Sequence, residues 1–309
     1  MYSQDFLDEL LIWAAARLEL SGDYQVQVLN GWFSGDFLWL LKTESRPMPL
    51  LRMVGSSKAA RLKHSFEALC SASALEIPVN APLFCEEYGD DVCVMASAYI
   101  PGEDGGQCLP RWGTDEAAAA GRSAGKMLRN LHDIPSEDDS PASWAKRRIL
   151  KYERYQEEAY RQGLSFSDQD RVEGFLEERL GSLARASISF QHDDFHPRNL
   201  IFREKQLVGV IDFDNCDSGD PIEDFYKLPW FTFPISEAFA RGQIEGYLEV
   251  DLVERFWERY NIAVAMSLAS SLVWAHRRQD RKMMFNFQQR IMEVVNTHDF
   301  TDGGPPTWF

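Results

Sequence analysis

Hydrophobic residues recur at helical spacing in some parts of the chain and form short, strand-like runs in others, so the pattern divides the chain into helical and strand-rich regions. In the first 20 residues they recur at helical spacing, which predicts an amphipathic helix. These residues are Phe6, Leu7, Leu10, Leu11, Ala14 and Leu18. From residue 25 to about 97, short apolar runs predict the strands QVQVLN, FLWLLKT, PLLRMV, PLFCEE and DVCVMAS. One predicted helix, near residues 57–75, interrupts these strands.

Beyond Pro101 the pattern becomes mainly helical. Thr114 has the character of an N-cap, since two acids follow it, and the helix it begins is predicted to run to about residue 131. Two charged helical segments follow, at about 143–161 and 167–183. A strand-and-loop island, residues 187–220, precedes a helical C-terminal third.

This order of elements predicts an α+β protein with two lobes. We expect a small β-rich N-terminal lobe at residues 1–98 and a larger α-helical C-terminal lobe at 99–309. A helical insertion is expected within the second lobe, at about 136–186.

Charge and cysteine usage narrow the classes of partner. The chain has 48 Asp and Glu against 32 Lys and Arg, a net charge of −16, which argues against nucleic-acid binding through a broad basic face. The same charge disfavours docking on anionic lipid, and the charge-free stretch 260–275 is shorter than the roughly 20 residues that span a bilayer. The first 20 residues do not resemble a secretory signal. The five cysteines include no CxxC pair, which favours reduced thiols and therefore the cytoplasm.

The segment HDDFHPRN followed by LIFREKQLVGVIDF is the most informative part of the sequence. Its pattern predicts a loop, a short hairpin and a second acidic loop, so Asp194, Asn199 and Asp212 would come to the same end of the strands. One carboxylate can then accept a hydroxyl proton while an amide oxygen and another carboxylate hold Mg²⁺. Phosphoryl transfer requires this combination of positioning and charge neutralisation.

At these residues the sequence resembles the aminoglycoside phosphotransferase/choline kinase family, which has a protein-kinase-like fold. The family motif His-Gly-Asp-x-His-Pro-x-Asn is followed by Ile-Asp-Phe or Ile-Asp-Trp, and then by Gly-Asp-Pro. The matching residues are His192, Asp194, His196, Pro197, Asn199, Ile211, Asp212, Phe213, Gly219, Asp220, Pro221 and Asp224.

The resemblance implies a role for each matched residue. Asp194 would be the catalytic base, and Asn199 and Asp212 would be the Mg²⁺ ligands. Three further residues would hold the catalytic loop in shape: His192, His196 and Asp220. Asp224 would be structural, at the start of a helix where a carboxylate is favoured.

One departure from the family pattern concerns the acceptor. Asp193 occupies a position where the family usually has glycine. Its carboxylate either points to solvent or meets a cationic group of the acceptor, and Asp217 is a second candidate acceptor contact. These acids favour a cationic acceptor alcohol, although solvation alone explains much of the acidity elsewhere.

The resemblance to the family's nucleotide-binding lobe is weaker. LNGWFSGDFLWLL has the form of a loop that covers phosphates, with Ser34 and Gly35 at its bend. The strand position that usually carries a phosphate-binding lysine has Arg52, with Glu67 as its candidate partner on the next helix. Lys42 is the alternative if the register differs, and a plain surface ion pair is the other interpretation.

MASAYIPGE resembles the family's linker, which contacts the purine, and contains Ser97 and Tyr99. The donor expected from the family is ATP, with GTP as the alternative.

The leading hypothesis is a kinase that transfers the nucleotide γ-phosphoryl group to a hydroxyl of a small molecule. Aminoglycosides and other cationic molecules are candidate acceptors, and antibiotic resistance is an expectation from the family alone.

Two alternative functions stay open. The arginine at position 52 and the sparse glycine loop suggest a kinase-like nucleotide-binding protein without activity. The dipeptides His132-Asp133 and His192-Asp193 suggest an HD-type metal phosphohydrolase.

Overall fold

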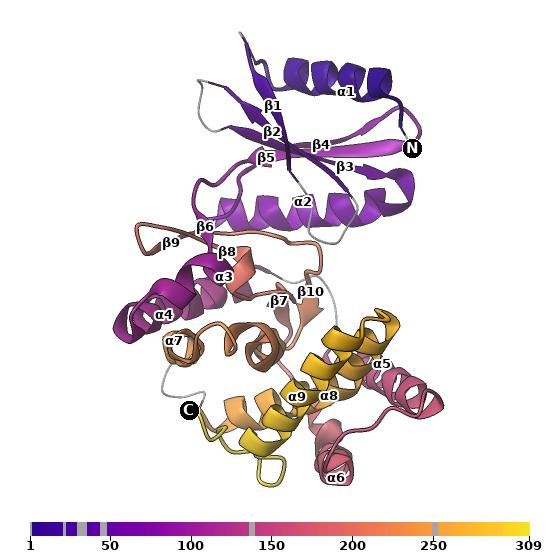
Figure 1. The fold of residues 1–309 in the computed structure, drawn as a ribbon, viewed down its shortest axis with the longest axis vertical. Helices are drawn as coiled ribbons and strands as arrows, with labels where there is room; N and C mark the ends of the chain where they lie inside the picture. The colour runs from indigo at the N-terminus through magenta and orange to yellow at the C-terminus, as the bar shows by residue number, and fades with distance from the viewer. Residues whose placement is uncertain (1, 21–22, 30–35, 44–47, 136–139, 249–252) are drawn as a thin grey trace. The chain divides into compact units, whose positions relative to one another are not determined.

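The computed structural model forms two compact units. It describes residues 2–20, 23–29, 36–43, 48–135, 140–248 and 253–309. The first unit combines Met1–Gly102 with Val208–Asn215, and the second combines Glu103–Leu207 with Cys216–Phe309 (Figure 1). The chain therefore divides after Gly102, beyond the expected boundary at residue 98, and the short segment that contains Asp212 belongs with the first unit.

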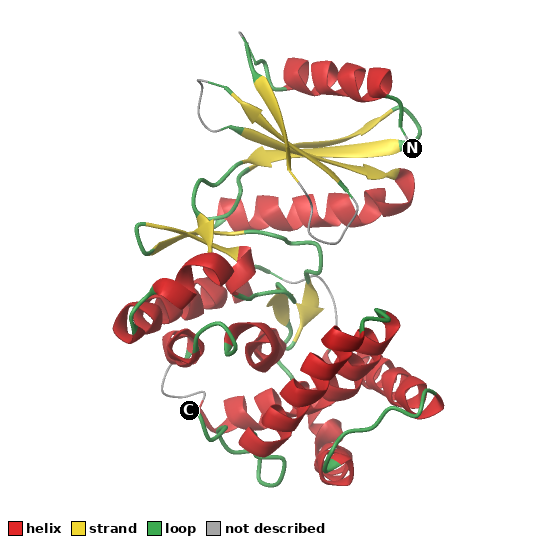
Figure 2. Cartoon of the chain, viewed as in Figure 1, coloured by secondary structure: helices red, strands yellow, loops and turns green. Residues whose placement is uncertain are grey.

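The first unit is a five-stranded antiparallel sheet with one helix on each face (Figures 1 and 2). The strand order is β1-β2-β3-β5-β4, and the predicted strands are all present. They are β1 (Gln25–Leu29), β2 (Phe37–Lys42), β3 (Pro49–Gly55), β4 (Pro82–Tyr88) and β5 (Val92–Ala98). Helices α1 (Gln4–Arg17) and α2 (Ala59–Ala74) confirm the two helices predicted in this region.

Alternation along the strands decides which side chains reach which helix. Leu51 and Met53 of β3 join Leu10 and Leu11 of α1 in one hydrophobic cluster. Because successive side chains of a strand point to opposite faces, Arg52 lies on the other face, which α2 covers. β5 is buried along its whole length since both of its faces are covered.

The second unit is mainly helical, as the sequence predicts. Its longer helices are α4 (Thr114–His132), α5 (Pro141–Arg161), α6 (Gln169–Arg179), α7 (Glu237–Tyr247), α8 (Val253–Arg277) and α9 (Arg281–Thr297). The N-cap of α4 is Gly113, one residue before the predicted Thr114, because the Glu116 carboxylate accepts a hydrogen bond from the Gly113 N–H at 3.1 Å.

Short strands frame the predicted strand-and-loop island. β7 (Ser189–Gln191) pairs antiparallel with β10 (Asp217–Gly219), and β6 (Glu103–Asp104) pairs with β8 (Leu200–Arg203). The chain turns at Glu204 and Lys205 into β9 (Gln206–Val210). The loop that joins β7 to β8 contains HDDFHPRN, so paired strands fix both of its ends.

Helices α4 and α7 pack at unusually short distance because glycines face one another. A Cβ atom at Gly121 or Gly125 of α4 would lie 2.3 or 2.1 Å from a backbone oxygen of α7. Gly242 and Gly246 of α7 face backbone oxygens of α4 in the same way, at 2.2 and 2.1 Å. At the ends of these two helices, His132 Nδ1 lies 2.7 Å from the Tyr247 hydroxyl.

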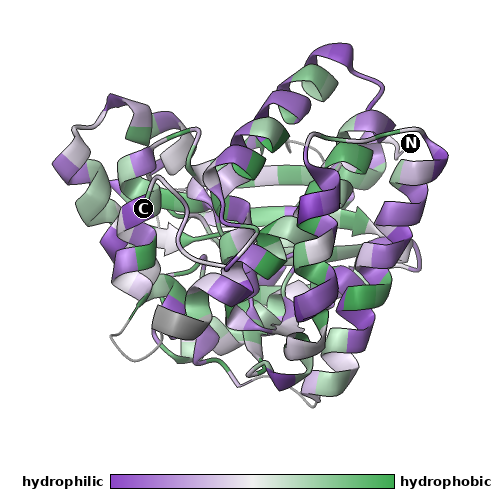
Figure 3. Ribbon diagram, turned by 90° about the horizontal axis from the view of Figure 1, so that it is seen from below, coloured by the Kyte–Doolittle hydropathy of each residue, from purple (hydrophilic) through white to green (hydrophobic). Residues whose placement is uncertain are grey.

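The charge-free stretch 260–275 forms most of α8 and is largely buried, which confirms the prediction of a core helix. Figure 3 shows hydrophilic and hydrophobic residues on different sides of the helices, as expected for amphipathic packing. Among the described residues, no helix is long and apolar enough to cross a membrane.

The glycine contacts predict a large difference between two Gly→Ala changes. Gly125→Ala should lower the free energy of unfolding by about 1–3 kcal/mol. Its methyl group would meet backbone of α7, which can move away only if the two helices separate. Gly174→Ala in α6 is the matched control: its Cβ would meet nothing within 4 Å, so we expect a gain of roughly 0.5–1 kcal/mol. Thermal and denaturant unfolding followed by circular dichroism measure both. Equal stability of the two variants would contradict this packing.

Candidate active site

The carboxylate of Asp224 holds the loop at residues 192–199, which the family resemblance predicts to be the catalytic loop. Asp224 lies in the 3₁₀ helix Pro221–Lys227 and is 1% exposed. Its two oxygens accept hydrogen bonds from the backbone N–H groups of His192 and Asp193, at 2.9 and 2.6 Å. His132 Nε2 lies 2.9 Å from the same carboxylate. The family resemblance implied a helix-start role for Asp224, but these donors show that it anchors the loop.

His132 serves the loop through both of its ring nitrogens. Nε2 contacts Asp224 and Nδ1 contacts Tyr247 at 2.7 Å, so the histidine joins the ends of α4 and α7 to the loop anchor. This engagement accounts for the first His-Asp dipeptide without a metal. Among the described residues, no group of three or more His, Cys, Asp and Glu side chains is arranged to hold a metal ion.

The structure brings together Asp194, Asn199 and His196 in the second unit. Asn199 Nδ2 donates to the backbone oxygen of Asp194 at 2.9 Å and to its Oδ2 at 3.2 Å. His196 Nε2 and Lys227 Nζ lie 3.5 and 3.0 Å from Oδ1. Burial alone would raise the pKa of Asp194, but His196 and Lys227 hold it well below its usual range. The carboxylate is therefore ionised and able to accept a proton.

The three residues expected to support the loop make different contacts. His192 is fully buried, and its Nδ1 accepts a hydrogen bond from the Asp194 N–H at 3.3 Å. The ring of His196 stacks on Phe231. Asp220 instead accepts from the Ile222 N–H at 3.1 Å and pairs with Arg259 at 3.2 Å, so it supports the following helix.

Lys227 is a site residue that the sequence analysis missed. Its side chain is 14% exposed and forms the ion pair with Asp194 described above. In the sequence, Lys227 lies in EDFYKL, shortly after the Gly-Asp-Pro motif. A lysine in such a segment is typical of a solvated helix face. Only the tertiary structure, which brings this segment back to the loop, shows that Lys227 lies beside Asp194.

The backbone explains why the family has glycine where this chain has Asp193. The residue adopts φ of +52°, in the left-handed region that glycine enters freely and aspartate tolerates. Its carboxylate is partly buried, and burial raises its pKa to about 6 against the opposing charges of Lys227, Lys151 and Arg148. The sequence suggested that this carboxylate meets either solvent or a cationic acceptor. In the structure it lies near cations of the chain itself. Its contact with an acceptor stays a prediction.

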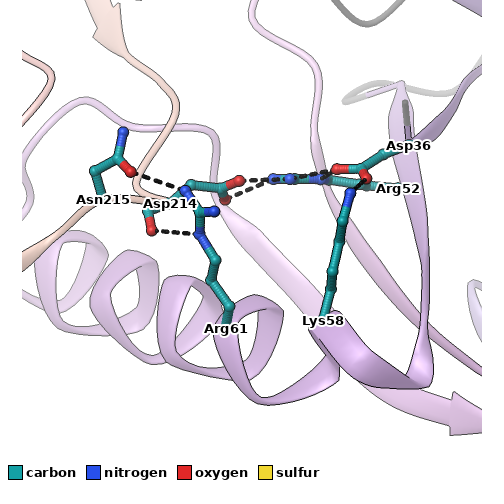
Figure 4. A network of polar contacts seen from close by, with 6 residues as sticks. All are labelled: Asp36, Arg52, Lys58, Arg61, Asp214 and Asn215. Atoms are coloured by element: carbon teal, nitrogen blue, oxygen red, sulfur yellow. Dashed lines mark hydrogen bonds and ion pairs between the residues drawn. The ribbon is translucent and has the colours of Figure 1, made fainter. Parts of the chain in front are cut away.

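In the first unit, Arg52 lies between two carboxylates (Figure 4). Its Nη2 and Nε contact Asp36 Oδ2 at 2.6 and 3.0 Å, and its Nη1 contacts Asp214 Oδ1 at 2.6 Å. Lys58 also contacts Asp36, at 2.7 Å, and the Asp36 side chain is only 2% exposed. Burial would lower the pKa of Arg52, but Asp214 and Asp36 raise it, so the guanidinium stays charged.

The expected pairing of Arg52 with Glu67 is not found among the described contacts. Glu67 is exposed on α2, whereas Arg61 of the same helix donates to the Asp214 backbone oxygen at 2.9 Å. The six residues from Arg61 to Glu67 turn roughly 240° around a helix, so the two side chains leave on different sides. Lys42 is exposed at the end of β2. The assignments of Arg52, Glu67 and Lys42 toward phosphate stay predictions.

The Asp212 segment is fixed to the rest of the first unit by its neighbours. Asp212 is exposed and has φ of +67°, a conformation that costs free energy in a non-glycine residue. Asp214 is held by Arg52, and Arg61 Nη2 contacts Asn215 Oδ1 at 2.8 Å. These contacts stabilise the strained turn that presents Asp212.

Four further residues were expected to contact the nucleotide, and the structure describes two of them. Ser34 and Gly35 lie outside the described residues. Ser97 is buried, and its hydroxyl accepts a hydrogen bond from Asn80 Nδ2 at 2.9 Å, while the Tyr99 N–H donates to the Met48 oxygen at 2.8 Å. The roles of Ser97 and Tyr99 toward a nucleotide stay predictions.

The candidate acceptor contact Asp217 is exposed in β10, opposite Gln191 of β7. Its Oδ1 accepts a hydrogen bond from the Ser218 N–H at 2.8 Å. Its role toward an acceptor also stays a prediction.

Comparison with protein families decides the assignment. A family described as the phosphotransferase enzyme family matches residues 26–260, about three quarters of the chain. The chain belongs to this family. The match extends from the first strand of the sheet to α8, so it includes the catalytic loop, the Asp212 segment and the Arg52 network. No match was found among the curated proteins.

Solved structures of phosphotransferases have the same kinase-like fold. APH(2'')-IIa, in a ternary complex with streptomycin and ATP, aligns with a TM-score of 0.63 at 17% identity, over 95% of this chain and 97% of the other. The amicoumacin kinase hAmiN, in complex with AMP-PNP, Ca²⁺ and Ami, gives 0.64 at 17% identity over 97% and 96%. The macrolide 2'-phosphotransferase MphH from Brachybacterium faecium gives 0.58 at 16% identity over 92% and 98%. The predicted membership of this family and the predicted two-lobed α+β fold are thus confirmed.

The raised pKa of Asp193 predicts a pH-dependent effect of Asp193→Gly in this phosphotransferase. Because the folded-state pKa of about 6 exceeds the reference value of 3.8, ionisation of this carboxylate opposes folding. The penalty is absent below about pH 4, grows as the pH rises toward 6 and is complete above it. Asp193→Gly should therefore be more stabilising, relative to the native protein, at pH 7.5 than at pH 5, by on the order of 1 kcal/mol.

Denaturant unfolding at the two pH values measures this difference. Asp193→Asn is the matched control, because it removes the charge but keeps a side chain at φ of +52°, so it should show the pH trend without the backbone gain. A stability difference that does not change between pH 5 and 7.5 would contradict the burial of this charge.

The Arg52 network predicts a stability defect rather than a purely catalytic one. Arg52→Ala leaves the buried Asp36 with only Lys58 of its two described cations, so we expect a loss of about 2–4 kcal/mol in unfolding free energy. Arg52→Lys should lose less, since the charge is kept although one ammonium cannot fork to both carboxylates. Arg17→Ala, which breaks an exposed pair with Glu86, is the control and should change stability by less than about 1 kcal/mol. Urea unfolding that ranks Arg52→Ala equal to Arg17→Ala would refute this expectation.

Proposed function

We propose that this member of the phosphotransferase family is a small-molecule kinase that uses Asp194 as its catalytic base. The observation that carries the proposal is the geometry of the Asp194 carboxylate. It is ionised, Asn199 and Lys227 each hold one of its oxygens, and its loop is anchored by the buried Asp224. A base must be fixed within hydrogen-bond reach of the hydroxyl it deprotonates, and this arrangement supplies the fixation.

The proposed reaction is a displacement at the γ-phosphorus of a nucleoside triphosphate. The acceptor oxygen forms a bond to phosphorus while the bond to the bridging oxygen breaks and its electron pair leaves with the diphosphate. The hydroxyl proton passes to Asp194. Oδ2 is the favoured atom, because Oδ1 has two nearby nitrogens, from Lys227 and His196, whereas Oδ2 has one described donor, Asn199.

Asn199 and Asp212 are the proposed Mg²⁺ ligands. Asn199 fits because its amide nitrogen is directed to Asp194, which leaves the amide oxygen as the ligand atom, and Asp212 fits because it is an exposed carboxylate. When bound, the ion would neutralise charge on the nucleotide phosphates. The complex of hAmiN with AMP-PNP and Ca²⁺ supports the use of a nucleotide with a divalent ion in this fold.

ATP is the proposed donor, with GTP as the alternative. One structural neighbour is an ATP complex and another, an aminoglycoside 2'-phosphotransferase-IIIa, is a GDP complex, so the fold accommodates both purines. Arg52 and the segments containing Ser34, Gly35, Ser97 and Tyr99 are the proposed contacts, and Glu67 is a more distant candidate because it does not pair with Arg52.

The acceptor is proposed as a hydroxyl-bearing small molecule. The neighbours named above are a streptomycin complex, an amicoumacin kinase and a macrolide phosphotransferase, so these classes of compound begin the acceptor panel. Resistance to such compounds is one proposed role. A cationic acceptor has weaker support than the sequence suggested. Asp194 pairs with Lys227, Glu223 pairs with Arg148, and Lys151 lies near Asp193, so cations of the chain offset much of this acidity. The cytoplasm, expected from the cysteines, is the proposed location.

A catalytically silent nucleotide-binding protein is the second candidate. It is favoured by Arg52, which already contacts Asp36 and Asp214, so nucleotide phosphates would compete with two carboxylates for it. Mg²⁺-dependent production of nucleoside diphosphate by the purified protein would exclude this candidate.

Asp194→Asn tests the proposed function. It keeps the size of the side chain but removes the proton acceptor, so turnover should fall by about 10²–10⁴-fold while nucleotide affinity stays within a few-fold. The measurement is coupled detection of ADP or GDP across the acceptor panel, with binding measured by isothermal titration. Asp170→Asn, at an exposed position of α6, is the matched control and should be fully active. An Asp194→Asn variant as active as this control would refute the assignment.

A further inference from the structure

Lys227 is a largely buried cation whose role in the proposed reaction, as described above, is to hold one oxygen of Asp194. Its Nζ lies 3.0 Å from Asp194 Oδ1, and its side chain is 14% exposed. The ammonium lies 5.0 Å from the centre of the Tyr226 ring and 5.6 Å from that of Phe231. Burial would lower its pKa, but neighbouring Tyr226, Asp194 and Asp193 raise it. The lysine is thus a fixed positive charge beside the base.

A single ion pair does not use all the donors of this group. An ammonium has three N–H donors. One contacts Asp194 Oδ1 and a second forms a hydrogen bond with the Tyr226 side chain. The rings of Tyr226 and Phe231 further restrict where Nζ can move. Among the described contacts, the ammonium is therefore held in place with one N–H left to contact a further anion.

The chemistry of the reaction brings an anion to this place. The acceptor oxygen must lie within about 3 Å of Asp194 to lose its proton, and the phosphorus within about 3–3.5 Å of that oxygen for in-line attack. An ammonium bonded to the same carboxylate then lies within reach of an oxygen of the phosphoryl group. Negative charge on these oxygens is what a preorganised cation stabilises in phosphoryl transfer.

We propose that Lys227 is a catalytic residue, whose ammonium contacts the phosphoryl group during its transfer as well as holding Asp194. The inference rests on the proposed kinase function. The bonds formed and broken are those given above: the hydroxyl proton goes to Asp194, the leaving electron pair goes to the diphosphate, and Lys227 keeps its three protons throughout. Its contribution is charge, so it needs no further reactant.

The test compares Lys227→Met, which keeps length without charge, with Lys227→Arg, which keeps charge. Lys205→Met is the matched control, because Lys205 is an exposed lysine of the same unit whose partner is Glu116. Lys227→Met should lower kcat by about 10²–10³-fold, as the loss of a preorganised donor does, while the ADP dissociation constant changes less than about threefold. Lys227→Arg should retain more activity than Lys227→Met, and Lys205→Met should match the native protein.

Affinity for ADP with Mg²⁺ and aluminium fluoride, which mimics the transferring phosphoryl group, separates a direct contact from an orienting role. If Lys227 touches the phosphoryl group, Lys227→Met should weaken this complex about tenfold or more, both in the native protein and in the Asp194→Asn background. If Lys227 only orients Asp194, the effect disappears in the Asp194→Asn background, and the proposal is overturned. Circular dichroism and ADP binding verify folding, and the conservative arginine variant provides the measurement if methionine impairs folding.

The two proposals fail in different ways. An inactive Asp194→Asn variant together with a fully active Lys227→Met variant overturns the role of Lys227 and leaves the kinase assignment intact. A native protein that produces no diphosphate with any acceptor or with water overturns the kinase assignment, and the role of Lys227 with it.

Discussion

A buried carboxylate needs donors, and the position of the loop at residues 192–199 depends on those of Asp224. Asp224 is removed from water, so its charge is tolerated only because two backbone N–H groups and His132 surround it. The same contacts determine the path of the catalytic loop at His192 and Asp193, and therefore where Asp194 lies. His132 in turn requires the ends of α4 and α7 to meet, and the facing glycines allow that close approach. Packing of two helices is thus coupled to the placement of Asp194.

Buried carboxylates are neutralised in the first unit too, but there a single arginine side chain pairs with two of them. Asp36 and Asp214 are brought together by Arg52, so an arginine at the position expected for a phosphate-binding residue also stabilises the lobe. Although the net charge is −16, several acids in or near the motif segments are paired with cations of the chain: Asp194 with Lys227, Asp214 with Arg52 and Glu223 with Arg148. The negative net charge therefore does not by itself indicate a cationic acceptor.

Features carried by local spacing were predictable from the sequence. The helices and strands follow from hydrophobic periodicity, and Asp194, Asn199 and His196 come together because they lie within one short loop. The errors concern contacts between segments distant in sequence. Glu67 was expected to pair with Arg52, but Asp214, which is 162 residues away in sequence, does so instead. Lys227 and the anchoring role of Asp224 were missed for the same reason, since each acts through a segment about 30 residues away.

The family, the two-lobed α+β fold and the motif residues could be predicted from the sequence, because they depend on periodicity and short-range spacing, which follow from the order of the side chains. Only the tertiary structure decided which charges meet. A buried carboxylate can be satisfied by a histidine, a lysine or a backbone N–H from anywhere in the chain, and sequence separation does not distinguish among these donors. Asp224, Lys227 and Arg52 acquired their partners from the packing of helices and strands, which fixes the distances on which ion pairs and hydrogen bonds depend.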